Sequence, residues 1–202
     1  MRFLIRLLRS SEAASSAEFA LVLPLLLVLL FGIIDAGRFM WEYNEAEKAT
    51  QMGARYAVVT DMVPAGLASY SFAITDKITQ GTTVPTANFD YVTCNSTDCD
   101  DCSGTACDAI KDTRDGTAFQ NIVTRMSYMY PQIRPANVTV TYKNVGLGFS
   151  GDPDGPDVST LVTVALTGLE FHPITCLVMC SISMPDFRAA LTLEDASGSA
   201  SN

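Results

Sequence analysis

Side chains that could do chemistry are few in this chain, and they stand far apart. His172 is the only histidine among the 202 residues, which makes a metal site built from several histidines impossible. A catalytic role for His172 would need a nucleophile and an orienting acid. The nucleophile motif G-x-S-x-G is absent, because residues 148–152 read GFSGD. We therefore expect a structural or surface histidine and no enzyme activity.

Six cysteines offer a second kind of chemistry. They fall into two groups, Cys94, Cys99, Cys102 and Cys107, then Cys176 and Cys180. An even number of cysteines in an exported segment indicates disulfides. Cys99 and Cys102 have the C-x-x-C spacing of a zinc site, but no second such pair follows. Free thiols are the third alternative. Four cysteines allow three pairings, and the sequence does not choose among them.

One loop is rich in both glycine and aspartate. Asp152, Asp154 and Asp157 are weak calcium candidates, because a hard cation prefers several carboxylate oxygens on a tight turn, but the bidentate Glu of an EF-hand is missing. Residues 146–151 match the pattern G-x-G-x-x-G. A phosphate-binding loop must open a helix, and the sequence DPDGPD that follows cannot form one. We expect a solvated loop and no cofactor.

An acidic residue, Glu18, stands directly before sixteen residues without a charge, 19–34. A run of this length and composition is typical of a membrane span in contact with lipid. The arginines Arg2, Arg6 and Arg9 precede it, which predicts a cytoplasmic N-terminus and an exported remainder. A carboxylate within the hydrocarbon costs roughly 2.5–3.5 kcal/mol at its centre. Glu18 either stays beside the lipid head groups or pairs with a positive charge, such as a free α-amino group on a neighbouring copy.

The positions of these residues predict the order of the structural elements along the chain. We predict a basic leader over 1–13, a transmembrane helix over 14–37, an amphipathic helix over 38–60 and an exported acidic α+β domain with an antiparallel sheet over 61–202. The apolar stripe of the amphipathic part comprises Phe39, Tyr43, Ala46, Ala49, Gly53, Tyr56 and Ala57, and the opposite side carries Glu42, Glu45, Glu47 and Lys48.

Within the exported part the periodicity is clear only in places. Residues 63–66 should end the long helix, and 67–118 carry no clear pattern. A helix is predicted over 119–130, capped by Asp115 or Thr117, and strands are predicted over 137–142, 159–169 and 188–193. The small, polar tail from Glu194 is expected to fray.

The charge balance excludes one class of partner. Beyond residue 18 the chain carries ten Lys and Arg against twenty Asp and Glu. Nucleic acid is bound by clustered basic side chains, and no such cluster follows the leader. The same acidity argues against electrostatic attraction of the exported part to anionic lipid.

The first 60 residues resemble the TadE-like minor pilins, or pseudopilins, of tight-adherence (Flp) pilus systems. The resemblance rests on AEFALVLPLL at 17–26, FGIIDAGR at 31–38 and GARYA at 53–57. It implies a pilin-like fold and a protein of the bacterial inner membrane that passes the membrane once, with a periplasmic C-terminal domain and a further expected location in the extracellular pilus. The implied partners are membrane lipid, other pilins or pseudopilins, a prepilin peptidase and the pilus assembly platform.

The resemblance also implies a processing site. In prepilins of this type a Glu at the fifth mature position is followed by an aromatic residue. Carried onto Glu18 and Phe19, this places the cut between Ala13 and Ala14, although glycine is the usual residue before the bond. Glu18 would then pair with the new amine of Ala14 on an adjacent subunit, and the role of the protein would be structural, in packing and pilus-dependent adhesion.

Two other interpretations stay open. The chain could be a secreted protein with an ordinary signal peptide, since Ile34-Asp35-Ala36 loosely resembles a cleavage box. Mature protein would then begin at Gly37. Alternatively, it could be a single-span anchored periplasmic protein whose outer domain binds a ligand.

Overall fold

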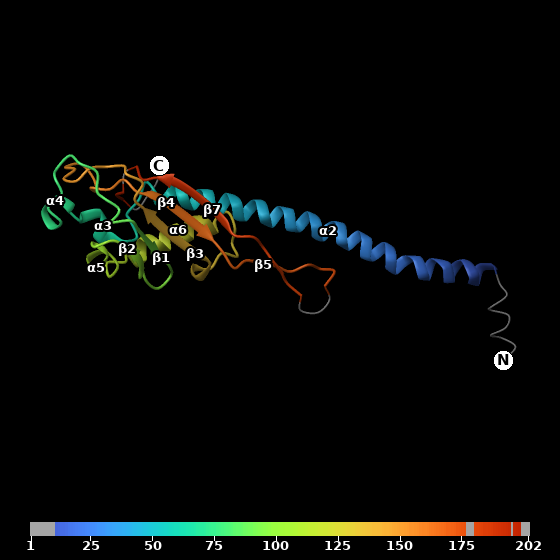
Figure 1. Cartoon of the computed structure of the whole chain (residues 1–202). Coiled ribbons are helices and arrows are strands. Elements are labelled where there is room, and N and C mark those ends of the chain that lie inside the picture. The colour runs from blue at the N-terminus through green and yellow to red at the C-terminus, as the bar shows by residue number, and fades with distance from the viewer. Residues whose placement is uncertain (1–10, 177–179, 195, 199–202) are drawn as a thin grey trace. The chain divides into compact units, whose positions relative to one another are not determined.

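The computed structural model describes residues 11–176, 180–194 and 196–198, of which 11–14 are described in their backbone alone. The chain forms two compact units. The first unit comprises residues up to 42 together with 170–182, and the second comprises 43–169 together with 183–202. Helix α2 (Ser11–Ala57) contributes to both (Figure 1). The predicted leader, including Arg2, Arg6 and Arg9, lies almost entirely outside the described residues.

Helix α2 is one continuous element of 47 residues with Pro24 inside it. The prediction of a single long helix is confirmed, but the helix ends at Ala57, earlier than the predicted stop at 63–66. The hydroxyl of Thr60 donates a hydrogen bond to the carbonyl oxygen of Tyr56 at 2.8 Å. The bond gives a partner to a carbonyl oxygen in the last turn of α2, where such oxygens lack intrahelical donors.

The second unit is built on a five-stranded antiparallel sheet. Its strands are β1 (Tyr91–Cys94), β2 (Asp101–Ser103), β3 (Val138–Lys143), β4 (Leu161–Leu166) and β7 (Phe187–Thr192), in the order β2-β1-β3-β4-β7 (Figure 1). The α+β class and the three predicted strands are confirmed, whereas β1 and β2 had no recognisable sequence pattern. Alternation in β3 buries Val138, Val140 and Tyr142 on one face.

Two helices supply apolar side chains to the core of this unit. Helix α6 (Gly116–Ser127) is capped by Asp115, whose carboxylate accepts hydrogen bonds from the backbone N–H groups of Thr117 and Ala118. A Cβ atom added at Gly53 of α2 would lie 2.7 Å from Sδ of Met126 in α6 and 3.3 Å from a methyl group of Val164 in β4. Glycine therefore allows α2 to approach both α6 and the sheet.

Short elements complete the chain: α3 (Ala65–Ser69), α4 (Phe72–Thr75), α5 (Cys107–Ile110), η1 (Pro135–Asn137), and a two-stranded sheet of β5 (Glu170–Phe171) and β6 (Ile182–Ser183). The expectation that the tail from Glu194 frays is wrong for its described residues, 194 and 196–198, since the N–H of Glu194 donates to the carbonyl oxygen of Val58 at 3.0 Å. Ala196 is buried, and Gly198 exchanges two hydrogen bonds with Asp61. These tertiary contacts hold a sequence that has no secondary-structure preference of its own.

Candidate functional site

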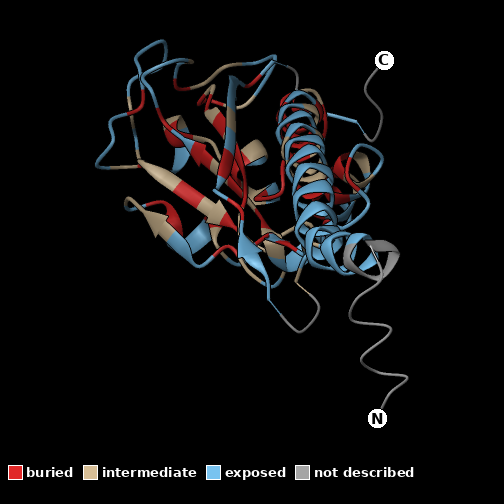
Figure 2. Cartoon of the chain, turned by 90° about the vertical axis from the view of Figure 1, so that its right-hand side faces the viewer, coloured by how far each residue is buried: buried red, intermediate tan, exposed pale blue. Residues whose placement is uncertain are grey.

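The apolar half of helix α2 is exposed on every side. All residues from 19 to 34 are exposed in the chain, among them Leu21 at 80% and Leu25 at 73% of their full area, and Figure 2 shows the long helix largely in the exposed colour. Within the described residues this is the one helix long and apolar enough to cross a membrane. A contiguous apolar surface of this size marks a site of contact with lipid or protein.

Glu18 and Phe19 lie at the start of this surface. Both are exposed, Phe19 at 62%. No hydrogen bond or ion pair joins Glu18 to another side chain in the described part of the chain. The backbone of Ala13 and Ala14 is helical, but their side chains lie outside the description. The processing site therefore stays a prediction.

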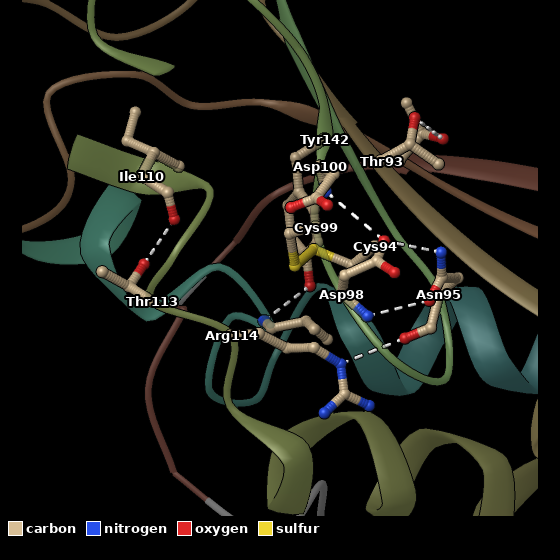
Figure 3. Close-up of a disulfide and its surroundings, with 12 residues drawn as sticks. Thr93, Cys94, Asn95, Asp98, Cys99, Asp100, Ile110, Thr113, Arg114 and Tyr142 are labelled. Atoms are coloured by element: carbon tan, nitrogen blue, oxygen red, sulfur yellow. Dashed lines mark hydrogen bonds between the residues drawn. A yellow bond between two sulfur atoms is a disulfide. The ribbon is translucent and has the colours of Figure 1, made fainter. Parts of the chain in front are cut away.

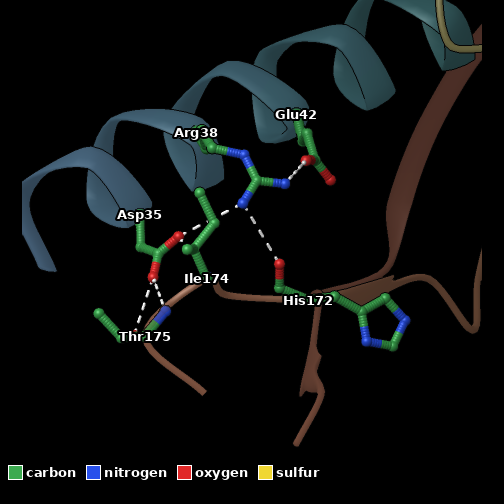
Figure 4. A network of polar contacts seen from close by, with 6 residues as sticks. All are labelled: Asp35, Arg38, Glu42, His172, Ile174 and Thr175. Atoms are coloured by element: carbon green, nitrogen blue, oxygen red, sulfur yellow. Dashed lines mark hydrogen bonds and ion pairs between the residues drawn. The ribbon is translucent and has the colours of Figure 1, made fainter. Parts of the chain in front are cut away.

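Asp35, at the other end of the run, forms a buried polar junction that sequence reasoning missed. The residue is buried, with 6% of its full area exposed. Its carboxylate accepts hydrogen bonds from the backbone N–H of Ile174 at 2.8 Å and of Thr175 at 2.7 Å. Figure 4 shows the side chain of Asp35 directed from α2 toward Thr175. The hydroxyl of Thr175 donates a third, at 2.8 Å. A carboxylate with three donors satisfies most of its acceptor capacity, so the loop at 174–175 is held to the helix.

Arg38 extends this junction by one helical turn. Its guanidinium lies 3.3 Å from Oδ1 of Asp35 and 3.5 Å from Oε1 of Glu42, and donates to the carbonyl oxygen of His172 at 3.4 Å (Figure 4). The same guanidinium stands 5.3 Å from the centre of the Phe171 ring. His172 itself is exposed and contributes its backbone rather than its imidazole to these contacts. One sequence signal was available: Asp35 and Arg38 are the first charges after the apolar run.

Beyond Glu42 helix α2 is buried along one stripe, as its periodicity predicts. Ala46, Ala49 and Ala57 have no exposed surface, Gly53 and Tyr56 are buried, and Phe39 and Tyr43 are half-buried. The polar side differs from the prediction in part. Glu47 and Lys48 are exposed, but Glu42 and Glu45 are half-buried, Glu42 because it pairs with Arg38.

All six cysteines form disulfides, which agrees with the prediction and settles the pairing. The pairs are Cys94–Cys99, Cys102–Cys107 and Cys176–Cys180. Each bond closes a short loop, so neither a zinc site nor a free thiol is left.

The loop closed by Cys94 and Cys99 is supported from two directions. Arg114 donates hydrogen bonds to the carbonyl oxygens of Asn95 and Ser96, at 3.1 and 2.9 Å. Asp98 accepts from the Asn95 amide at 2.8 Å (Figure 3). The hydrogen bond from the Thr97 hydroxyl is the main cause that lowers the pKa of the Asp98 carboxyl below its ordinary value.

The aspartates of the glycine-rich loop serve the fold of the second unit. Asp157 is buried, and its carboxylate accepts hydrogen bonds from the backbone N–H groups of Phe72 at 2.7 Å and Asp152 at 3.2 Å. Asp152 in turn accepts from the N–H of Asp154. No group of three candidate ligands converges among the described residues. The calcium hypothesis therefore gains no geometric support, and residues 146–151 open no helix.

Comparison with known proteins gives one match. The family model described as TadE-like protein matches residues 13–55, a segment that contains Glu18, the apolar run, the Asp35 junction and most of the buried stripe. The family resemblance is confirmed for this segment. Neither the curated proteins nor the solved structures contain a match to the chain.

Proposed function

Because residues 13–55 form a TadE-like segment, we propose that the protein is a minor pilin or pseudopilin anchored in the bacterial inner membrane by a single span. It acts structurally in assembly of a tight-adherence-type pilus and has no catalytic role. Its N-terminus faces the cytoplasm, and its second unit is exported to the periplasm.

One observation carries this proposal, namely that the apolar run 19–34 within the matched segment is exposed on all sides. A helix that serves only the core of its own chain is covered on one face, whereas residues 19–34 have no cover in the described chain. Lipid can cover these residues while the protein waits in the membrane. Helices of other pilins can replace that lipid when a fibre forms.

Glu18 makes the replacement of lipid by helices of other pilins specific. An exposed carboxylate at the edge of an apolar helix is costly in lipid unless a positive charge meets it. Cleavage between Ala13 and Ala14 by a prepilin peptidase would create an amine four residues away in sequence. The amine of one copy and the Glu18 carboxylate of the next would attract each other strongly, because lipid screens charges far less than water does. Such a pair fixes the register between neighbouring helices.

Disulfides fit the proposed location of the second unit. The periplasm is oxidising, and Cys94–Cys99 and Cys102–Cys107 lie in that unit. The net acidic charge keeps this unit soluble and free of nucleic acid. Its surface is the part available to the assembly platform or to other exported partners.

The first test is the N-terminus of the mature protein, measured by mass spectrometry in cells with and without the prepilin peptidase. We expect Ala14 as the first residue when the peptidase is present and the full leader when it is absent. A mature chain beginning at Gly37 would instead identify a secreted protein with an ordinary signal peptide.

The second test replaces Glu18. Glu18→Gln keeps the size of the side chain and removes its charge, so the protein should still enter the membrane but fail to support pilus formation. Glu47→Gln is the matched control, since Glu47 is also an exposed glutamate of α2 but lies outside the apolar half. If Glu18→Gln supports normal piliation, the protein is an anchored binding protein rather than an assembling subunit.

A further inference from the structure

The loop that Asp35 holds is unusual in composition. Residues 171–185 contain no Asp, Glu, Lys or Arg, fifteen positions in all, which is the longest charge-free stretch after the apolar run itself. The rest of the chain beyond residue 18 is strongly acidic. The segment that is hydrogen-bonded to the end of the apolar helix therefore contains no Asp, Glu, Lys or Arg.

The hydrogen bonds of Asp35 fix the position of this loop along the axis of helix α2 relative to the apolar run. Asp35 follows Ile34, the last residue of the run, and its carboxylate bonds the backbone of Ile174 and Thr175. A helix rises only about 1.5 Å per residue. The loop at Ile174 thus lies level with the end of the apolar helix, and both belong to the same compact unit.

Apolar side chains of this loop face outward. Ile174 is 50% exposed and Ile182 is 49% exposed. The Cys176–Cys180 disulfide closes the loop between them. Residues 177–179 lie outside the described part of the chain. Single exposed isoleucines are common, but Ile174 lies in the segment that is hydrogen-bonded to Asp35, directly after the apolar run 19–34.

We propose that this clamped loop, residues 171–176 with Cys180 and Ile182, inserts into the outer leaflet of the membrane beside the span. Its partner is the boundary between lipid head groups and acyl chains, which accepts uncharged apolar side chains and polar backbone. The attraction is hydrophobic, so it is compatible with the acidic charge of the exported part. Asp35 is the positioning residue, because it ties the loop to the helix at the depth of the interface.

This inference rests on the proposed membrane span, and the experiment separates the two. Trp41 is the only tryptophan in the chain, so a Trp41→Phe background permits single-tryptophan probes. Three full-length variants carry Leu26→Trp in the span, Ile174→Trp in the loop, or Ile74→Trp as the matched control. Ile74 is an isoleucine of α4 in the second unit and is 79% exposed.

Each variant is reconstituted into phosphatidylcholine vesicles, and tryptophan quenching by lipids brominated along their acyl chains is measured. We expect strong quenching at Leu26→Trp by deep bromines, quenching at Ile174→Trp by bromines near the head groups, and none at Ile74→Trp. If Leu26→Trp is quenched while Ile174→Trp behaves like Ile74→Trp, the loop proposal fails and the span stands. If Leu26→Trp is also unquenched, the span fails and the loop proposal falls with it.

Asp35→Ala tests the clamp. Added to the Ile174→Trp variant, it should reduce quenching to the level of the Ile74→Trp control, because the three hydrogen bonds that residues 174 and 175 donate to Asp35 are lost. Added to the Leu26→Trp variant, it should leave quenching unchanged, which shows that the span is still inserted. Unchanged quenching at Ile174→Trp would mean that Asp35 does not position the loop.

Discussion

The two halves of helix α2 belong to one continuous element but differ in what covers them. From 19 to 34 every residue is exposed and almost every side chain is apolar. From 46 to 57 apolar residues alternate with polar ones at helical spacing, and the apolar stripe is buried. The first half is apolar all round, as expected of a helix that contacts lipid or other chains, whereas the second half is apolar only where its own sheet and α6 contact it.

This difference teaches that the placement of charged residues decides which environment a helix needs. Residues 19–34 carry no charge, whereas residues 46–57 carry Glu47, Lys48 and Arg55. The position of the charges separates a helix that needs an external environment from one that is satisfied within its chain. Substitutions that reverse the polarity of each half should therefore have opposite effects on membrane insertion and on folding.

The largest expected effects come from one arginine placed in each half. Ala49 has no exposed surface, so Ala49→Arg buries an unpaired charge and should destabilise the second unit by about 3–5 kcal/mol. Leu26→Arg should weaken membrane insertion by roughly 2.5–3.5 kcal/mol and leave that unit folded. Denaturant unfolding in detergent and carbonate extraction from membranes measure the two effects. Equal loss of folding in both variants would contradict the division of the helix.

Two glycines of helix α2, Gly53 and Gly37, test how closely different parts of the helix are packed. Gly53 is in close contact with Met126, whereas an added Cβ at Gly37 meets nothing within 4 Å. Gly53→Leu should destabilise the second unit by about 1–3 kcal/mol through overpacking. Gly37→Leu should change its stability by less than about 0.5 kcal/mol. Unfolding midpoints of the two variants in the same detergent give the answer, and a stable Gly53→Leu protein would show that α2 does not pack closely against α6.

The stability of helix α6, which packs against the buried half of α2, depends on its N-cap residue Asp115. Asp115→Ala removes the acceptor for the first turn of α6 and should cost about 1 kcal/mol. Asp115→Asn is the control, since asparagine caps about as well and should retain most of the stability. Both are measured by denaturant unfolding. If the two variants lose the same amount, the charge of Asp115 rather than its capping oxygen is responsible.

The smallest effect is a pH dependence confined to the second unit. The hydrogen bond from Thr97 lowers the pKa of Asp98 in the folded protein, so its ionised form stabilises the fold above the ordinary carboxyl pKa of about 4. That contribution is lost as the pH falls through the lowered pKa. Wild type should therefore exceed Asp98→Asn in stability at neutral pH, with a gap that narrows below about pH 4. A gap that does not change with pH would assign the effect to geometry alone.

Local patterns were enough to predict part of this molecule. The long helix, its buried stripe, the cap at Asp115 and strands β3, β4 and β7 all follow from periodicity and capping chemistry, which act between residues close in sequence. Strands β1 and β2 were missed. They are short: β1 is set by pairing with β3, β2 is set by pairing with β1, and the Cys94–Cys99 and Cys102–Cys107 bonds close the loops beside them.

The sequence by itself determined that a charge-free helix follows Glu18 and that an acidic, cysteine-containing α+β part comes after it, because charge and periodicity are carried by each residue regardless of its partners. Only the tertiary structure decided which cysteines pair, that Asp157 is used inside the fold, and that Asp35 holds a loop 139 residues away. Those contacts join distant segments, and their geometry exists only after the chain has folded.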